Sequence, residues 1–273
     1  MSLQIGSALR YGFDRLFERN GLLLVGLFVL AGLFAAVAGQ TLSQVLFDWI
    51  VQQTWYQEAV AEVGEGPLLP ESAGPFAVSD SPLVAGVLLT ASVFVSEAIR
   101  VISDRTFVSD ATETLYQPER NLGRATLFGF VAGLIAVVAT GIGLVLLIVP
   151  GIFIALCLYF VRQEIAVFDK GPIAALEGSW ALTKGHRLNL LGLAVVLEIL
   201  SIIANRGTNI VFGSVSPVVA TVVSTVIGAF LVAYASATVA GAYRQLLGMK
   251  RPDSEFALSS FGDPYGDIDE EWR

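Results

Sequence analysis

The residues from Ala125 to Val161, ATLFGFVAGLIAVVATGIGLVLLIVPGIFIALCLYFV, form an uncharged apolar stretch that decides how the chain folds. A single straight helix of about 37 residues, rising about 1.5 Å per residue, would extend over roughly 55 Å. The hydrocarbon core of a bilayer is only about 30 Å thick, so this stretch must turn back on itself. Proline lacks the amide that continues a helix and glycine accepts turn dihedrals. Pro150 and Gly151 therefore predict a tight external hairpin.

Further apolar runs of membrane-spanning length flank this hairpin, and the composition agrees with a membrane protein. The chain of 273 residues is 55% hydrophobic and 15% charged, a balance typical of a polypeptide whose solvent is mostly lipid. The sequence predicts an all-α integral membrane protein with six transmembrane helices. The spans are expected at about 21–39, 83–102, 125–149, 152–168, 188–204 and 216–243.

Positive charges lie beside alternate gaps between these runs, and cytoplasmic loops are the ones that carry Lys and Arg. The segment 40–82 holds Asp and Glu but no Lys or Arg, as expected of an external loop. Arg206 is then the lone basic residue outside, and both termini lie in the cytoplasm of a multi-pass cell-membrane protein. Two alternatives are weaker: a cleaved signal ending at 36–38, because the apolar run is too long, and a second hairpin at Ser216-Pro217, which would export the last basic residues.

The acidic balance of the chain carries its own inferences. The net charge is -8, and residues 252–273 collect acidic residues among Ser, Gly and Pro, which predicts a flexible cytoplasmic tail after a membrane domain at 1–251. A lysine-poor, acidic chain suggests a halophilic, archaeal source, and an acidic loop and tail alone are the alternative explanation of the charge. Nucleic acid is not expected as a partner, because it requires a basic face. Cys157 is the single cysteine, so it is expected to pack as a small hydrophobe.

Three segments on the predicted inner side each precede a pair of spans. Apolar residues at helical spacing between Ile5 and Phe17, opposite Arg10, Asp14 and Arg15, predict an amphipathic helix at the membrane interface. Residues 173–182 have a similar pattern, and 107–124 is the weakest of the three because Pro118 interrupts it. Three repeated units, each an interfacial helix plus two spans, are one interpretation. A coincidence of hydropathy is the other.

Two stretches, LIVPGI at 147–152 and GPIAALEGSWALTKG at 171–185, carry a resemblance to a known family. They resemble the six-span family that includes the membrane domain of glycerophosphoryl diester phosphodiesterases and related uncharacterised bacterial and archaeal proteins. The resemblance implies the six-span fold. It does not imply catalysis, because in that family the phosphodiesterase activity belongs to a separate soluble domain with acidic metal ligands and histidines, and this chain has one histidine, His186.

The second stretch also has a physical interpretation. Trp180 is a suitable membrane-interface anchor, Ser179 and Thr183 are placed to bond backbone groups, and Gly185 is placed to end a helix. The basic residues at this end, Lys184, His186 and Arg187, are expected to face an anionic inner leaflet. The candidate residues for contact with lipid headgroups are Trp180, Lys184, His186 and Arg187, with simple anchoring as the alternative role.

Glu198 is the sharpest functional candidate, because it lies within the apolar run 188–204, where an ionised carboxylate is costly unless it is paired, hydrated or protonated. Transport or proton coupling, structural pairing with an arginine, and placement near the outer interface all remain open for it. Small residues elsewhere predict close helix packing in lipid. They are Gly129 and Gly133, which form G-x-x-x-G, and Ala229, Ala233, Ala237 and Gly241, which recur every fourth residue.

Three functions remain compatible with the sequence. The first is a non-enzymatic membrane protein that organises lipid or partner proteins, with membrane lipid as a partner and no cofactor or metal. The second is a transporter or permease component, in which Glu198 and polar neighbours line a wet cavity. The third is a membrane enzyme acting on lipid, which needs acidic and basic residues that converge at an interface.

Overall fold

The computed structural model describes residues 3–63, 74–212 and 216–250. These residues form helices and no strand, which confirms the all-α class. The predicted tail at 252–273 lies outside the described residues. The helices are α1 (Ile5–Leu16), α2 (Arg19–Val51), α3 (Thr54–Val63), α4 (Pro82–Val108), α5 (Leu122–Leu146), α6 (Ile148–Cys157), α7 (Val161–Phe168), α8 (Pro172–Thr183), α9 (Arg187–Phe212) and α10 (Pro217–Lys250).

The described part of the chain has six helical segments that are long and apolar enough to cross a membrane: α2, α4, α5, α6 with α7, α9 and α10. The protein is therefore of the multi-pass membrane class by helix length and composition. Several spans extend beyond the predicted bounds, and α2, for example, continues to Val51. A helix can continue through polar residues because its backbone groups form hydrogen bonds with one another. The described part of the predicted external loop includes the short helix α3.

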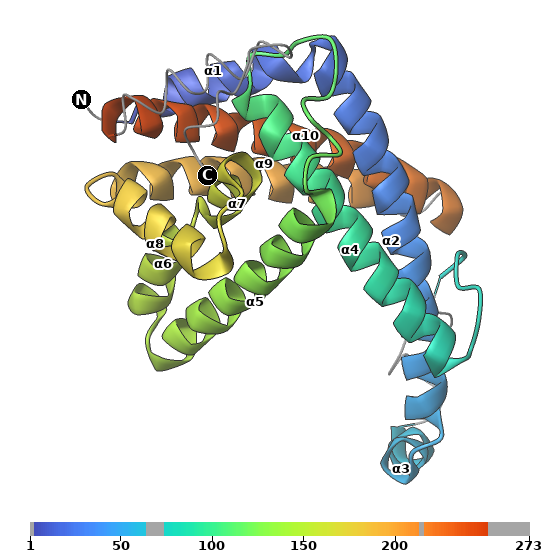
Figure 1. The fold of residues 1–273 in the computed structure, drawn as a ribbon. Helices are drawn as coiled ribbons and strands as arrows, with labels where there is room; N and C mark the ends of the chain where they lie inside the picture. Colours follow the sequence, from blue (N-terminus) through green and yellow to red (C-terminus); the bar gives the residue numbers. More distant parts are fainter. Residues whose placement is uncertain (1–2, 64–73, 213–215, 251–273) are drawn as a thin grey trace.

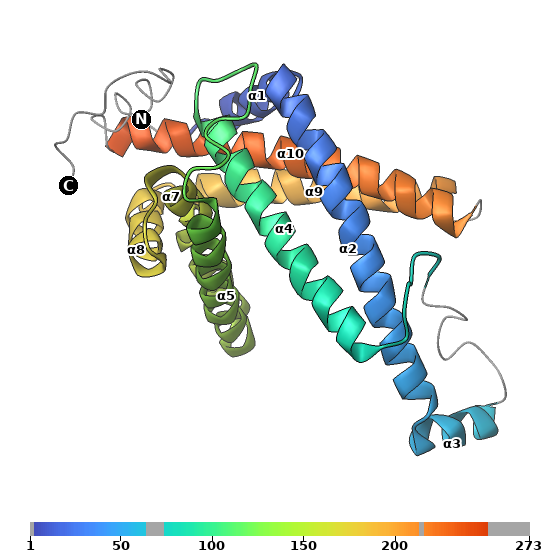
Figure 2. The same ribbon diagram turned by 45° about the vertical axis from the view of Figure 1, so that its right-hand side comes forward.

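The spans are paired into three helical hairpins: α2 with α4, α5 with α6, and α9 with α10. α10 also packs across α2 and α4, whereas α5 packs on α4. Figure 1 shows that the hairpins meet at one end, where α1, α7, α8 and the C-terminal turns of α10 lie, and Figure 2 shows that their other ends diverge. We call the common end, together with the loop 109–121, the hub.

The turn between α5 and α6 differs from the prediction. It lies at Leu147, whose backbone is extended, and Pro150 is in the first turn of α6. A proline ring would clash with the carbonyl four residues before it, so the helix breaks ahead of Pro150, and the first turn of the next helix tolerates the missing amide. Gly151 allows close approach rather than a turn, because a Cβ there would lie 2.6 Å from the backbone nitrogen of Leu144.

The span predicted at 152–168 is also not one continuous helix. α6 ends at Cys157 and α7 begins at Val161, so residues 158–160 interrupt it. Helices form at both predicted amphipathic segments, 5–17 and 173–182, as α1 and α8. The apolar stripe predicted on α8 does not lie on one face, because Ile173 and Trp180 are exposed whereas Leu182 is buried. The third such segment does not: residues 109–121 are a loop in which Gln117 and Asn121 have positive φ, and only two of the three inner segments are alike.

The predicted packing residues divide into two groups. The stripe on α10 is buried: Ala229, Ala233, Ala237 and Gly241 all face neighbouring helices, and a Cβ on Gly241 would lie 2.7 Å from the Tyr11 ring. On α5, Gly129 faces Glu97, with 2.5 Å from a Cβ to the carboxylate. A Cβ on Gly133 would have none of the described residues within 4 Å, so the G-x-x-x-G pair does not form one seam.

Candidate functional site

The hub is held by side chains that bond the carbonyl end of α4. Arg15 of α1 is 5% exposed, and its guanidinium donates to the carbonyl oxygens of Thr106 at 2.9 Å, Ser109 at 3.2 Å and Ala111 at 2.6 Å. It also pairs with Glu18. The amphipathic pattern had placed Arg15 on a solvated face. It is instead buried, because the end of a helix leaves carbonyl groups that need donors.

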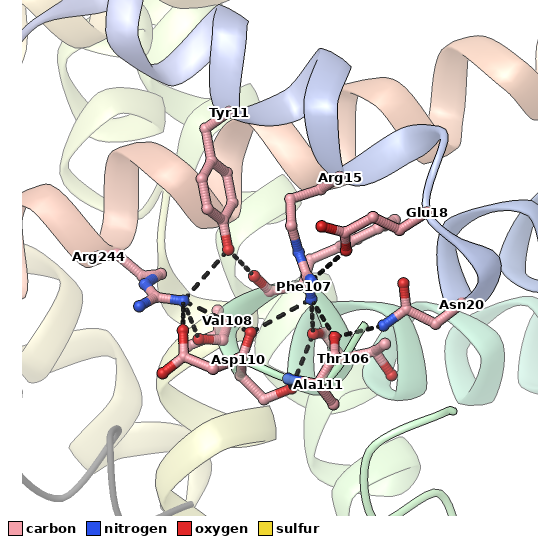
Figure 3. A network of polar contacts seen from close by, with 11 residues as sticks. Tyr11, Arg15, Glu18, Asn20, Thr106, Phe107, Val108, Asp110, Ala111 and Arg244 are labelled. Carbon is pink, nitrogen blue, oxygen red and sulfur yellow. Dashed lines mark hydrogen bonds and ion pairs between the residues drawn. The ribbon is translucent and has the colours of Figure 1, made fainter. Parts of the chain in front are cut away.

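Arg244 of α10 reaches the same helix end from the other side (Figure 3). It donates to the carbonyl of Val108 at 3.2 Å and pairs with Asp110 at 2.7 Å. Its guanidinium lies 5.7 Å from the centre of the Tyr11 ring, and the Tyr11 hydroxyl donates to the carbonyl of Phe107 at 2.6 Å. Cations at the negative end of a helix dipole are favourable. The N-terminal and C-terminal helices are thereby tied to the end of the second span.

A second set of arginines bonds the carbonyl end of α7. Arg105 donates through Nε to the carbonyl of Ala166 at 2.7 Å, and Arg120 donates to that of Val167 at 3.1 Å. Both arginines pair with Asp169, at 3.2 Å and 2.7 Å. The loop 109–121 is therefore fixed between α4 and α7, which explains how an irregular segment is ordered in the hub.

One carboxylate is fully buried between α7, α8 and α10. Glu164 accepts a hydrogen bond of 2.9 Å from the Tyr243 hydroxyl and pairs with Lys170. A Cβ on Gly178 would lie 2.3 Å from the Glu164 carboxylate. The glycine of the GSWALTKG stretch is therefore where α8 passes over this buried acid.

Ser179 and Thr183 in the same stretch bond backbone groups at the α6–α7 break. Ser179 Oγ donates to the carbonyl of Cys157 at 2.8 Å and accepts from the amide of Phe160 at 3.1 Å. Thr183 Oγ1 lies 3.4 Å from the same carbonyl of Cys157. The sequence had predicted that these hydroxyls bond the backbone, and the structure supplies the partner.

A cavity of about 270 Å³ opens between α4, α7 and α10, next to the hub and toward the middle of the spans. We call it the polar cavity. Arg100, Asp104, Arg162 and Gln163 line its polar side, with Ser236 opposite on α10. Arg162 is already paired with Glu97, at 3.1 Å. Arg100 is exposed and has no hydrogen bond or ion pair of its own among the described residues.

Two buried oxygen atoms at this cavity lack a partner within the described chain. Asp104 is 3% exposed and Gln163 is 4% exposed. The Gln163 amide nitrogen donates to Asp104 Oδ1 at 3.1 Å, which leaves Asp104 Oδ2 and Gln163 Oε1 without hydrogen bonds. Unsatisfied buried acceptors are costly, and such groups bond water or a ligand in most proteins. The cavity thus offers a free cation and free acceptors side by side.

A second cavity, of about 250 Å³, adjoins the first and is mostly apolar. It lies between α2, α4 and α10, and it shares Arg100 and Val232 with the polar cavity. Its other walls include Phe28, Gly32 and Ala229. We call it the apolar cavity. Because it is lined by Ser96 where the polar cavity is lined by Asp104, it lies about 12 Å further along α4 from the hub.

The residues predicted to contact headgroups gather around α8 and the start of α9. The Arg187 guanidinium lies 4.5 Å from the centre of the Phe153 ring and 5.2 Å from that of Trp180. Trp180 is 45% exposed, and the side chain of Lys184 is also exposed. The pKa of His186 is lowered, first by burial and then by the charge of Lys250. Arg187 is therefore held by aromatic rings, while Trp180 and Lys184 face outward.

Glu198 lies near the middle of α9 and faces away from the protein. Its side chain is exposed, and it makes no hydrogen bond or ion pair with any residue that the structure describes. Its neighbours on that face, Val195, Ile199 and Ile202, are exposed apolar residues. Neither cavity described above includes it, so Glu198 does not join the arginine-lined site.

Sequence reasoning missed Arg100, Asp104, Arg162 and Gln163 as a site. Glu97 of α4 pairs with Arg162 of α7, across two helices. A usable signal was present: Glu97, Arg100 and Arg162 lie in the inner halves of two predicted spans. In the described ranges no group of three or more His, Cys, Asp or Glu side chains is arranged to hold a metal.

The helices and the site define an all-α, multi-pass membrane class of protein built from three hairpins on a polar hub. The chain belongs to the family described as Domain of unknown function (DUF7847), whose model matches residues 3–246. No curated protein and no solved structure matches the chain. The family match therefore covers most of the chain and assigns it no activity.

Proposed function

We propose that this protein is a non-enzymatic, multi-pass protein of the cell membrane that organises lipid around its hairpins. One observation carries the proposal: buried arginines of the hub, such as Arg15 and Arg105, form hydrogen bonds and ion pairs with carbonyls and carboxylates of the chain itself. The spans meanwhile expose large apolar side chains, including Leu30, Val137 and Ile203. A hub whose charges are paired internally, joined to spans that expose apolar side chains, is better suited to contact with lipid than to turnover of a substrate.

The orientation and ancestry belong to the same proposal. The basic residues of the hub support a cytoplasmic hub with both termini inside. The motif at 171–185 supports kinship with the membrane domain of glycerophosphoryl diester phosphodiesterases. The acidic, lysine-poor composition supports a halophilic, archaeal source. A halophilic protein should unfold at a higher temperature in 2 M than in 0.1 M KCl, since salt screens self-repulsion, and a lower temperature at 2 M would remove that inference.

The test of the lipid-organising function is extraction of the protein from its membrane in polymer-bounded discs, followed by mass spectrometry of lipids and proteins. The expected result is a surrounding lipid composition that differs from the bulk membrane. Lipid identical to the bulk, together with a second protein in fixed ratio, would contradict lipid organisation and favour the scaffolding of a partner protein instead.

A lipid-acting enzyme is the second candidate, because acidic and basic side chains do converge at the polar cavity. Asp104 and Gln163 hold free acceptor atoms beside Arg100. Incubation of the purified protein with phosphatidylethanolamine decides between the two: intact lipid after hours is expected, and release of a water-soluble phosphate ester would favour the enzyme. Transport through Glu198 has less support, since that residue lines neither cavity.

A further inference from the structure

We propose that the two adjoining cavities form one lipid site, which takes a phospholipid whose headgroup carries a hydrogen-bond donor beside its phosphate. Zwitterionic phosphatidylethanolamine is the best match. This inference rests on the proposed lipid-organising function and names the lipid class that the function would select.

The order of the two cavities matches the polarity of a lipid. On α4 the polar cavity extends from Arg100 to Asp104, toward the hub, and the apolar cavity extends from Arg100 to Ser96, away from it. On α10 the same order holds, from Ser236 near the hub to Thr225 away from it. A lipid of the hub-side leaflet would place its headgroup in the polar cavity and an acyl chain along the apolar one.

Arg100 lies where the phosphate of such a lipid would be. It lines both cavities, it is exposed, and no described side chain pairs with it. It is about 12 Å from the hub end of α4, which is too deep for a bare cation in hydrocarbon but within reach of a headgroup by snorkelling. Guanidinium groups bind phosphate oxygens through paired N–H donors. The neighbouring Arg162 is neutralised by Glu97, so Arg100 is the cation left for a ligand.

The free acceptors determine which headgroup fits. Asp104 Oδ2 and Gln163 Oε1 are buried and without hydrogen bonds in the described chain, so they need a donor from the ligand. An ammonium or hydroxyl group beside the phosphate supplies one, whereas the quaternary ammonium of phosphatidylcholine has no N–H. The Arg100 guanidinium and the Asp104 carboxyl group lie one helical turn apart on the same face, and their order complements a headgroup with a phosphate and an amine.

The test measures lipid binding to the delipidated, detergent-solubilised full chain by native mass spectrometry. The probes are phosphatidylethanolamine, phosphatidylglycerol and phosphatidylcholine with identical acyl chains. The unmodified protein is expected to bind phosphatidylethanolamine about tenfold or more tightly than phosphatidylcholine, the difference expected for a hydrogen bond to a charged group. Equal binding of phosphatidylethanolamine and phosphatidylcholine overturns the proposal without requiring any variant.

Two variants separate the roles of the charges. Arg100→Gln is expected to weaken the binding of phosphatidylethanolamine and phosphatidylglycerol alike by about tenfold, while Asp104→Asn is expected to remove the preference for phosphatidylethanolamine over phosphatidylcholine. The matched control is Arg124→Gln, since Arg124 is an exposed arginine at the start of α5 that lines neither cavity. If Arg100→Gln binds lipid as Arg124→Gln does, the site is wrong.

The two proposals fail in different ways. If polymer-bounded discs show enriched lipid but Arg100→Gln binds lipid like its control, the cavities are not the site and the lipid-organising function stands. If the discs hold bulk lipid and the purified protein does not discriminate among the three headgroups, both proposals fall. An enrichment of phosphatidylglycerol over phosphatidylethanolamine retains the phosphate and donor requirement and rejects the amine.

Discussion

Ser179 donates a hydrogen bond of 2.8 Å to the carbonyl oxygen of Cys157, across the break between α6 and α7. The same hydroxyl accepts from the amide of Phe160. A helix that stops leaves carbonyls behind it, and the helix that follows begins with free amides. One side chain of α8 thus satisfies a backbone acceptor and a backbone donor at a buried helix break, and it connects the motif at 171–185 to the shape of the fourth span.

The first prediction concerns this hydroxyl. Ser179→Ala is expected to lower the free energy of unfolding by about 1–3 kcal/mol, because the buried amide of Phe160 loses its partner and the carbonyl of Cys157 keeps only the longer contact with Thr183. The measurement is unfolding in mixed micelles by a denaturing detergent, followed by the helical circular dichroism signal.

Ser201→Ala is the matched control. Ser201 Oγ donates only to the carbonyl of Leu197 within its own helix, at 3.1 Å, and that carbonyl already serves the helix. The control is expected to change the unfolding free energy by less than about 0.5 kcal/mol. Equal losses in the two variants would show that Ser179 does not hold the break.

A second prediction tests the hub. Arg15→Met retains an apolar stem but removes donors to three carbonyls, so it is expected to cost about 3 kcal/mol or more of unfolding free energy. The control on the same helix is Arg10→Met: the Arg10 side chain is 86% exposed and pairs with Asp14 at 3.9 Å, a kind of contact worth about 0.5 kcal/mol. Thermal unfolding of the two purified variants gives the comparison, and a similar loss for both contradicts the assigned role of Arg15.

The class and the number of spans could be predicted from the sequence, because a run such as Gly21 to Gly39 has no stable place outside lipid. Ser179 and Thr183 were also recognisable as backbone-bonding residues, since their spacing places them on one face of a helix. Local pattern was sufficient in each of these cases.

What could not be predicted depends on distant partners. Arg15 belongs to a polar face by periodicity, yet it is buried because carbonyls from residues 106–111, far along the chain, converge on it. Pro150 indicated that a turn was needed but not that the ring moves the break ahead of itself to Leu147. The pairing of Glu97 with Arg162 needed the crossing of α4 and α7, which hydropathy does not contain.

A third prediction uses two glycines of α5 that differ only in their surroundings. A Cβ on Gly143 would lie 2.8 Å from the Cα of Gly151 in α6, whereas a Cβ on Gly141 has nothing within 4 Å among the described residues. Gly143→Ala is expected to destabilise by about 1–3 kcal/mol through overpacking. Gly141→Ala is expected to stabilise by up to about 1 kcal/mol, because alanine favours the helix. Chemical unfolding of both variants should give opposite signs, and shifts of the same sign would argue against the close α5–α6 contact.

The last prediction concerns pH and His186, the one histidine of the chain. Burial first, and then the charge of Lys250, lower the pKa of its imidazole in the folded protein. The unfolded chain therefore binds more protons than the folded one between that lowered pKa and the ordinary value of about 6.5. Stability is fully present above pH 6.5 and falls as the pH is lowered through this window. The effect should be small because the ring is half-exposed. Unfolding temperatures from pH 5 to 8 should show the step in the unmodified protein and not in His186→Asn, and a stability that rises on acidification in both would contradict the assignment.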